Sequence, residues 1–321
     1  MTGSKQRLSL STGVALDVWT AGDPAKPAIL FLHGFPESHR TWRHQMAALA
    51  DRYFCIAPDQ RGYAGSDKPQ DVSAYKVPIL VADVLALADA LGIASFTLVG
   101  HDWGGAIAWA TALRAPNRVA RLIQCNAAHP YVFQKTLIFD PAQRAASQYI
   151  TEFRERDIEA EVAEKGLDWF FEDRFAKISG GHLTAEDKAA YLAEWGQPGA
   201  LTGMLNWYRA SPMAVPAPDA PAVSTPFLDA PFPKLAMPVL VIWGMKDEAL
   251  LPCQLDGLEA HIADLEVARV PDAGHFIPWE KPEAVSDAMR DWLARRHSRL
   301  SGPPADPASA QDSGQGHQSR Y

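Results

Sequence analysis

The sequence predicts an α/β fold in which a mostly parallel sheet is covered by helices and interrupted by a helical insertion. Two apolar runs, Ala28–Leu32 and Val239–Gly244, are continuous rather than alternating, as in strands that are buried on both faces. Runs of this kind alternate with segments of helical periodicity, which favours right-handed βαβ units in one sheet. The alternation stops near residue 130 and resumes near residue 229.

The chain therefore divides into a first core segment, an insertion, a second core segment and a tail. We place these segments at residues 1–129, 130–228, 229–297 and 298–321. The insertion contains charged and aromatic stretches of helical character, and a proline-rich stretch returns the chain to the sheet. The tail is small, polar and rich in proline, so we expect it to be disordered.

Local patterns predict the elements in order. Two short apolar stretches on either side of Ser11–Gly13 are typical of an antiparallel hairpin, and Gly92 follows a helix as a C-terminal glycine. The strands expected are 8–10, 14–19, 28–32, 54–57, 96–99, 119–124, 239–244 and 265–270. The helices expected are 41–49, 77–91, one ending near 114, segments within 149–165, 189–195 and 201–210, and a last helix at 282–296.

Charge and composition exclude several classes of protein. The net charge is −8, the pI is near 5.7, and 47% of the residues are hydrophobic. This suits a globular protein without a basic surface, so we expect neither nucleic acid nor a membrane as a partner. Three widely spaced cysteines indicate neither a disulfide framework nor a zinc site. Because no secretory signal is visible, we expect the protein in the cytoplasm. As its assembly we expect a monomer or a homodimer.

One stretch carries the most specific chemical signal. Leu98–Ala106 contains an apolar run, a glycine, one acidic residue and a small-residue helix start. The spacing Gly100-x-Asp102-x-Gly104 matches the nucleophile elbow of α/β-hydrolases, with aspartate where serine is usual. Asp102 is therefore the candidate nucleophile.

Two further residues complete a candidate triad. Asp247 follows the strand that ends at Gly244, and His275 follows the last strand. Taken alone, Asp247 could be a helix N-cap and His275 a core histidine. The order of nucleophile, acid and histidine along the chain is that of α/β-hydrolases, and all three candidates follow strands, so we predict a catalytic triad.

An aspartate nucleophile selects a different electrophile from serine. A carboxylate that attacks an sp³ carbon forms an alkyl ester with the enzyme, whereas attack on a carbonyl would give only a labile anhydride. We therefore expect His275, oriented by Asp247, to direct water onto an ester of Asp102. The expected oxyanion hole combines the backbone N–H groups of Phe35 and Trp103.

Four motifs give the chain a family resemblance that spans residues from about 10 to 297. They resemble those of α/β-hydrolase-fold epoxide hydrolases, which implies an eight-stranded sheet with a helical cap domain. In that family two cap tyrosines hold and protonate the epoxide oxygen, and Tyr208 and Tyr149 match them. The motifs are His33–Ser38, Asp59–Ser66, Gly100–Gly105 and Gly274–Phe276.

The resemblance implies that an epoxide is opened to a vicinal diol without a metal or cofactor. The expected partners are a small apolar epoxide and water. We expect substrate contacts from His33, Pro36, Trp103 and Trp207, although His33 is also a candidate for holding its own loop by a local hydrogen bond. A phenol is a suitable donor because its ordinary pKa of about 10 keeps it protonated at neutral pH.

The main alternative is a haloalkane or haloacid dehalogenase, which resembles this chain through the same aspartate, histidine and acid. Haloalkane dehalogenases resemble this chain, but they usually have asparagine at the position of Phe35. Fluoroacetate-type haloacid dehalogenases usually have arginine at the position of Trp103. Both departures favour the epoxide. A ligand-binding homologue without turnover is the remoter alternative, since none of the expected catalytic residues is missing.

Overall fold

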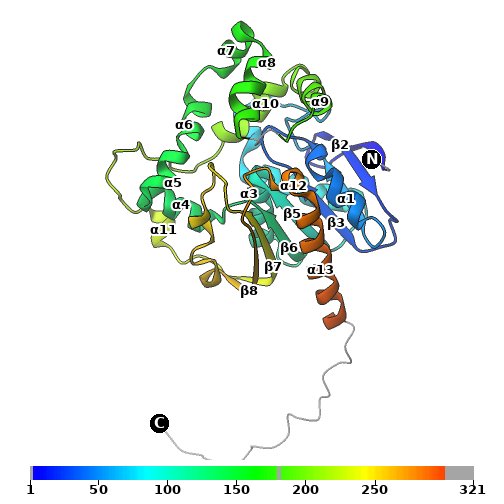
Figure 1. Cartoon of the computed structure of the whole chain (residues 1–321). Helices are drawn as coiled ribbons and strands as arrows, with labels where there is room; N and C mark the ends of the chain where they lie inside the picture. Colours follow the sequence, from blue (N-terminus) through cyan, green and yellow to red (C-terminus); the bar gives the residue numbers. More distant parts are fainter. Residues whose placement is uncertain (1–2, 179–181, 301–321) are drawn as a thin grey trace, which may run out of the picture.

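The structure is a computed structural model that describes residues 3–178 and 182–300. Within these residues eight strands form one sheet, in the order β1-β2-β4-β3-β5-β6-β7-β8 (Figure 1). β2 runs antiparallel to β1 and β4, and the other pairs are parallel. The strands are β1 Ser4–Ser9, β2 Ala15–Ala21, β3 Ala28–Leu32, β4 Phe54–Pro58, β5 Phe96–His101, β6 Val119–Cys125, β7 Leu235–Gly244 and β8 Ile262–Val270. The predicted eight-stranded, mostly parallel sheet is confirmed.

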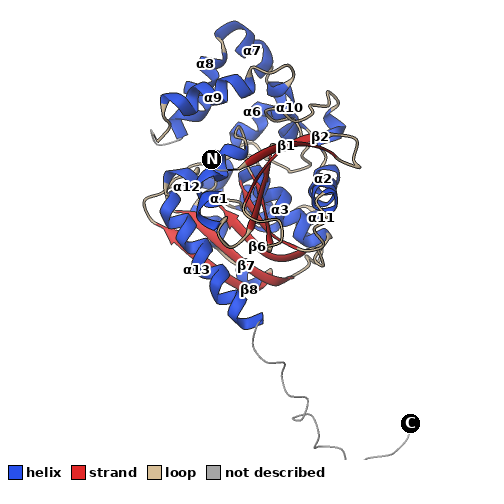
Figure 2. Ribbon diagram, turned by 90° about the vertical axis from the view of Figure 1, so that its right-hand side faces the viewer, coloured by secondary structure: helices blue, strands red, loops and turns tan. Residues whose placement is uncertain are grey.

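Helices cover both faces of this sheet (Figure 2). Every residue of β3 is buried, because successive side chains point into two different cores. Leu30 packs in the core formed with α2 and α3, whereas Phe31 packs in the core formed with α1 and α13. These core helices are α1 Arg43–Leu49, α2 Val77–Ala90, α3 Asp102–Arg114, α12 Ile277–Glu280 and α13 Pro282–Leu300, and η1 His39–Trp42, η2 Val72–Tyr75, η5 Pro252–Leu255 and η6 Leu258–Ala260 are single turns.

A helical insertion between β6 and β7 lies at one end of the sheet (Figure 1). The stretch 149–165, expected to be helical, forms two helices because Asp157 caps the second by accepting a hydrogen bond from Ala160 N–H. The helices of the insertion are α4 Pro130–Phe139, α5 Pro141–Ala146, α6 Gln148–Glu155, α7 Ile158–Lys165, α8 Leu167–Phe170, η3 Phe171–Phe175, η4 Ala176–Ile178, α9 Ala185–Trp195, α10 Ala200–Arg209 and α11 Pro226–Asp229.

The C-terminal helix is longer than the sequence predicts. The last helix continues to Leu300, so residues 298–300 of the predicted tail are helical instead. The remainder of the predicted tail, 301–321, lies outside the described residues. Cys55, Cys125 and Cys253 are free thiols. No helix in the described part of the chain is long and apolar enough to cross a membrane.

Candidate active site

The turn between β5 and α3 holds Asp102 in an unusual backbone conformation. Its φ is +50°, a region that non-glycine residues seldom adopt. The turn is also tightly packed: a Cβ on Gly100 would lie 2.5 Å from the Cα of Gly105, and one on Gly104 would lie 2.2 Å from the carbonyl oxygen of Leu32. The glycines of the motif therefore allow the strained turn that places Asp102 at its tip.

The three candidate triad residues meet at the carboxyl end of the sheet. The Nδ1 atom of His275 lies 2.7 Å from Oδ2 of Asp247, and its Nε2 atom lies 3.5 Å from Oδ2 of Asp102. All three side chains are buried or nearly so. The imidazole therefore lies between the two carboxylates, with one ring nitrogen facing each of them.

Asp247 is fixed by donors that the sequence did not reveal. Asn126, which is completely buried, donates from Nδ2 to Oδ2 of Asp247 at 2.7 Å and accepts from Gly244 N–H at 2.7 Å. The other carboxylate oxygen accepts from the N–H groups of Ala249 and Leu250, each at 2.8 Å. Asn126 directly follows β6, and this position at the end of a parallel strand was the one sequence feature that could have marked it as a residue of the site.

The charges of the three groups are strongly coupled. Burial opposes the charged form of His275, but the carboxylates of Asp247 and Asp102 raise its pKa well above the ordinary value. Burial likewise opposes ionisation of Asp102, but the hydrogen bond and positive charge of His275 hold the pKa of this carboxyl below its ordinary value. The free protein therefore favours an imidazolium between two carboxylates.

The loop after β3 brings one backbone donor to Asp102. The N–H of Phe35 donates to Oδ1 of Asp102 at 2.8 Å. His33 holds this loop in place: its Nε2 accepts from Gln60 N–H at 3.0 Å, which leaves Nδ1–H to donate to the carbonyl oxygen of Gly34 at 2.9 Å. One oxygen of the candidate nucleophile is thus occupied, and the other faces His275.

Both candidate tyrosines reach the same place from the insertion. Tyr149 on α6 and Tyr208 on α10 have ring centroids 6.2 Å apart, and the Tyr208 ring lies edge-on to that of Trp103 at 5.1 Å. Burial, together with the charge of Asp102, raises the pKa of both phenols well above the ordinary value. Both hydroxyls are therefore protonated donors.

Two cavities adjoin at these residues, and both are lined by Asp102, Tyr149 and Tyr208. The larger, of about 270 Å³, has an apolar wall that includes Pro36 and Phe153. The smaller, of about 40 Å³, is otherwise apolar apart from the indole of Trp103. Charged side chains line part of the larger cavity, namely Asp173, Arg174 and Glu248.

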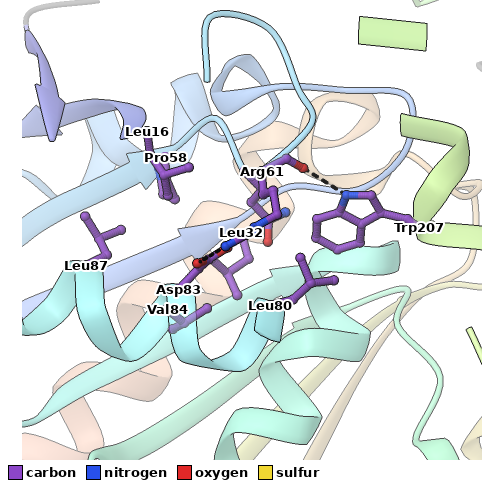
Figure 3. A pocket seen from close by; sticks show the side chains of 10 residues that line it. Leu16, Leu32, Pro58, Arg61, Leu80, Asp83, Val84, Leu87 and Trp207 are labelled. Carbon is purple, nitrogen blue, oxygen red and sulfur yellow. Dashed lines mark hydrogen bonds and ion pairs between the residues drawn. The ribbon is translucent and has the colours of Figure 1, made fainter. Parts of the chain in front are cut away.

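His33 and Trp207 line neither of these cavities. The His33 ring is fully buried and uses both nitrogens within the loop. The indole N–H of Trp207 donates to the carbonyl oxygen of Arg61 at 2.9 Å, beside a small separate pocket that the Arg61–Asp83 ion pair also lines (Figure 3). Both residues therefore lie outside the walls of these two cavities, and their contact with substrate stays a prediction.

A buried polar network lies behind the triad. Glu37 accepts from His101 Nδ1–H at 3.0 Å and from the indole N–H of Trp279 at 2.7 Å, and His101 Nε2 lies 2.9 Å from the backbone oxygen of His275. Glu37 and His101 stand inside the motifs identified in the sequence, but their contact joins positions 64 residues apart, which no local pattern reveals. Among the described residues, no cluster of three or more metal-ligating side chains could hold a metal ion.

Comparison with known proteins identifies the family. Residues 27–282 match the alpha/beta hydrolase fold family. A solved structure described as novel epoxide hydrolases from metagenomes of hot environments is 50% identical with a TM-score of 0.86, and the match covers 91% of this chain and 99% of that one. Epoxide hydrolase 4 of Mus musculus is 31% identical over 295 residues, which are 90% of this chain and 79% of that protein.

This chain belongs to the α/β-hydrolase-fold epoxide hydrolases. The fold and the family predicted from the sequence are thereby confirmed, and the protein is a hydrolase. Among its epoxide hydrolase relatives, a mutant of the Bacillus megaterium enzyme solved with its product (R)-3-[1]naphthyloxy-propane-1,2-diol is 32% identical, with a TM-score of 0.79 over 90% of this chain and all of that one. An AB hydrolase superfamily protein of Bacillus subtilis, YfhM, is 36% identical over 91% of this chain and 99% of that protein.

Proposed function

We propose that this protein opens an epoxide to a vicinal diol through an ester on Asp102. The observation that carries the proposal is the position of the Asp102 carboxylate. Its Oδ1 accepts from Phe35 N–H at 2.8 Å, and the two cap phenols, Tyr149 and Tyr208, line the same cavity as this carboxylate. A carboxylate held beside two protonated phenols suits a reaction in which an sp³ carbon is attacked while its oxygen takes up a proton.

In the first step Oδ2 of Asp102 attacks one epoxide carbon. The bond from Oδ2 to carbon forms, the bond from that carbon to the epoxide oxygen breaks, and the oxygen takes a proton from Tyr149 or Tyr208. The raised pKa of both phenols keeps that proton in place until the alkoxide develops, and an alkoxide is basic enough to remove it. The resulting phenolate regains a proton before the next turnover.

In the second step water attacks Cγ of the Asp102 ester while His275 accepts one of its protons. Oδ1 becomes the oxyanion and is stabilised by the Phe35 N–H, with the Trp103 N–H at the start of α3 as the second proposed donor. When the intermediate collapses, the bond between Cγ and Oδ2 breaks, and the leaving alkoxide takes the proton from His275. The diol is released, and the Asp102 carboxyl that forms gives its remaining proton to His275, which restores the carboxylate and the imidazolium.

The coupled charges support this order of steps. In the free protein the carboxylates of Asp247 and Asp102 both raise the pKa of His275. Esterification removes the charge on Asp102, so the pKa of His275 falls, the imidazolium gives its proton to the phenolate left by the first step, and the neutral imidazole becomes available as a base. Formation of the ester thus prepares the group that hydrolyses it.

The two cavities support an apolar epoxide with unequal substituents. The epoxide ring lies beside Asp102, a short apolar group fits the cavity of about 40 Å³, and a larger group occupies the cavity of about 270 Å³. The helical insertion, which supplies both tyrosines, is on this proposal the cap that closes the site.

A single turnover in ¹⁸O-labelled water with a styrene-oxide-type substrate tests the mechanism. A first turnover should transfer an unlabelled oxygen from Asp102 to the diol and leave ¹⁸O in the carboxylate. His275→Gln should still be alkylated but should hydrolyse the ester slowly, so intact-mass analysis should detect a substrate adduct on Asp102. Label that appears directly in the diol, with no adduct, would contradict the mechanism.

The same experiment distinguishes the dehalogenase alternative. Phe35 stands where haloalkane dehalogenases usually place a halide-binding asparagine, and its contact with Asp102 is through the backbone. An adduct that forms with a haloacid but not with an epoxide would replace this proposal with a dehalogenase.

A further inference from the structure

A helix of the insertion docks on the loop that carries the Phe35 N–H. α9 lies on the side of the insertion nearest α1 (Figures 1 and 2). The indole N–H of Trp195, the last residue of α9, donates to the carbonyl oxygen of Pro36 at 2.7 Å. One turn earlier, the Tyr191 hydroxyl lies 3.5 Å from Oε1 of Glu37. Consecutive residues of the loop are therefore tied to one cap helix.

Two contacts between side chains hold the same helix to the segment that follows the loop. Asp187 lies 3.4 Å from Arg43, and Glu194 lies 3.8 Å from Arg40. Because these contacts lie along the length of α9, the whole helix rests on residues 36–43 of the core. The position of the loop thus depends on how α9 is seated.

Trp195 is itself held rigidly. Its side chain is buried, and its ring packs against those of Phe170, Phe171, Phe175 and Tyr191 at centroid distances of 5.5 to 5.8 Å. The Phe35–Pro36 peptide group lies between the Pro36 carbonyl and the Phe35 N–H, and the proline ring restricts rotation at Pro36, so holding this carbonyl also restrains that peptide group. A buried donor on a packed ring is suited to fixing that peptide group.

We propose that Trp195 is a positioning residue that aligns the Phe35 N–H with Oδ1 of Asp102 through the Pro36 carbonyl, so that cap docking sets the oxyanion hole. The inference rests on the proposed function. Donor alignment matters most for hydrolysis of the ester, because Oδ1 gains a full negative charge only in that step. The attack on the epoxide carbon depends less on it, since Oδ1 becomes less charged as the ester forms.

Trp195→Phe tests the proposal because it removes the N–H and keeps an aromatic ring in the cluster. Rapid quench with intact-mass detection measures ester formation and ester decay separately. We expect decay to slow roughly tenfold, less than the 10²–10³-fold cost of removing an oxyanion donor outright, while the rate of formation changes by less than about twofold. The adduct should then accumulate in the steady state.

Trp169→Phe is the matched control. Trp169 is another cap tryptophan, half-buried beneath the Lys165 ammonium at 4.4 Å, and it lines neither cavity. This variant should show wild-type rates. The amplitude of adduct formation reports the folded fraction, so a variant that folds poorly loses amplitude, whereas a misaligned donor changes the decay rate at full amplitude.

The outcomes separate this inference from the proposed function. Wild-type decay in Trp195→Phe, an equal fall in both rates, or a loss of amplitude alone would overturn the positioning role. If neither the wild type nor His275→Gln forms an adduct with any epoxide, the proposed function fails and the inference falls with it. Slow decay in Trp195→Phe but not in the control Trp169→Phe supports both.

Discussion

Gly34 lies directly against the side chain of Asp102. A Cβ on Gly34 would lie 2.5 Å from Cβ and 2.6 Å from Oδ1 of Asp102, closer than non-bonded atoms can approach. The backbone of the loop after β3 can therefore reach the carboxylate only because residue 34 has no side chain. This close approach is what allows the next N–H, that of Phe35, to donate to Oδ1.

Gly34→Ala should consequently lower the catalytic rate strongly while changing the stability of the fold little. The added methyl group must displace Asp102 or the loop, and misplacement of reacting groups by about 1 Å costs roughly 10²-fold in rate. We expect kcat for diol formation to fall at least that far, with a modest change in Tm. Gly104→Ala is the contrast, because its methyl group would meet the backbone oxygens of Leu32 and His33 and should lower the free energy of unfolding. Equal effects of both variants on stability would contradict this distinction.

Asn126→Asp should remove the hydrogen bond that Asn126 donates to Asp247 and destabilise the fold. The new carboxylate can still accept from Gly244 N–H, but it cannot donate to Oδ2 of Asp247, and it places a second negative charge 2.7 Å away in a fully buried site. Two carboxylates in one site raise the pKa of one of them, so the pair takes up a proton as the pH falls. Relative to the wild type, the variant should be least stable at high pH and should recover on acidification.

Thermal unfolding across a pH series measures this effect. The exposed Asn117, changed to Asp, adds the same charge just before β6 instead of just after it and serves as the control. We expect Asn126→Asp to lose more than about 3 kcal/mol at neutral pH, the range for an uncompensated buried charge, and Asn117→Asp to lose almost nothing. A pH-independent loss in Asn126→Asp would mean that charge repulsion is not the cause.

Asp102→Asn should lower the pKa of His275. The carboxylates of Asp247 and Asp102 both raise this pKa, and the substitution removes one of them, as esterification does on the proposed mechanism. NMR titration of the His275 ring should therefore give a lower midpoint in the variant than in the wild type. His261 lies in a separate aromatic cluster beside His129 and Tyr131 and should titrate alike in both proteins. An unchanged midpoint for His275 would remove the charge argument for the order of the two steps.

The sequence predicted the sheet and the elbow because both depend on local patterns. The buried strand Ala28–Leu32 has the bounds expected from its apolar run. The spacing Gly100-x-Asp102-x-Gly104 predicted a strand, a tight turn and a helix, which the structure contains. Tyr149 and Tyr208 were named through a family resemblance rather than from periodicity, which cannot tell which cap residues face a cavity.

The contacts that support the site depend instead on long-range geometry. Asn126 reaches Asp247 across 121 positions and Trp195 reaches Pro36 across 159, so no window of sequence contains both partners. Likewise, Trp207 was expected to contact substrate as one of the cap aromatics, whereas its indole N–H donates to the Arg61 carbonyl, a contact that the sequence does not reveal. Residue type indicates what a side chain can do, but only packing decides what it faces.

Phe133→Ala should change which epoxides fit. Phe133 is buried on α4 and is the largest side chain, apart from those of Trp103 and the two tyrosines, that lines the cavity of about 40 Å³. Its truncation should raise kcat/KM for epoxides with a longer second substituent relative to that for methyl-substituted ones. Phe139→Ala, at the exposed end of the same helix, is the control and should leave the ratio unchanged. An unchanged ratio in Phe133→Ala would place the second substituent elsewhere.

Glu194→Gln should stabilise the protein at high pH. Burial, and to a smaller extent the charge of Asp59, raises the pKa of Glu194 to about 7, although Ser38, Arg40 and Lys5 act in the opposite direction. The folded state therefore favours the protonated carboxyl, whereas the unfolded chain ionises near the model value of 4.5. The stability that the neutral group provides is fully present below 4.5, declines as the pH rises, and is lost above 7.

Chemical denaturation at pH 5 and pH 8 checks this sign. A glutamine stays neutral at every pH, so the variant should gain up to roughly 3 kcal/mol over the wild type at pH 8 and much less at pH 5. Glu186→Gln, an exposed position on α9, is the matched control and should show no such difference. If α9 determines the position of the loop that carries the Phe35 N–H, the rate of ester decay in Glu194→Gln should also vary less with pH than in the wild type. The reason is that Glu194 directly precedes Trp195 on this helix. A gain in stability that is equal at both pH values would mean that the pKa of Glu194 is the same in the folded and unfolded states, and would contradict the prediction.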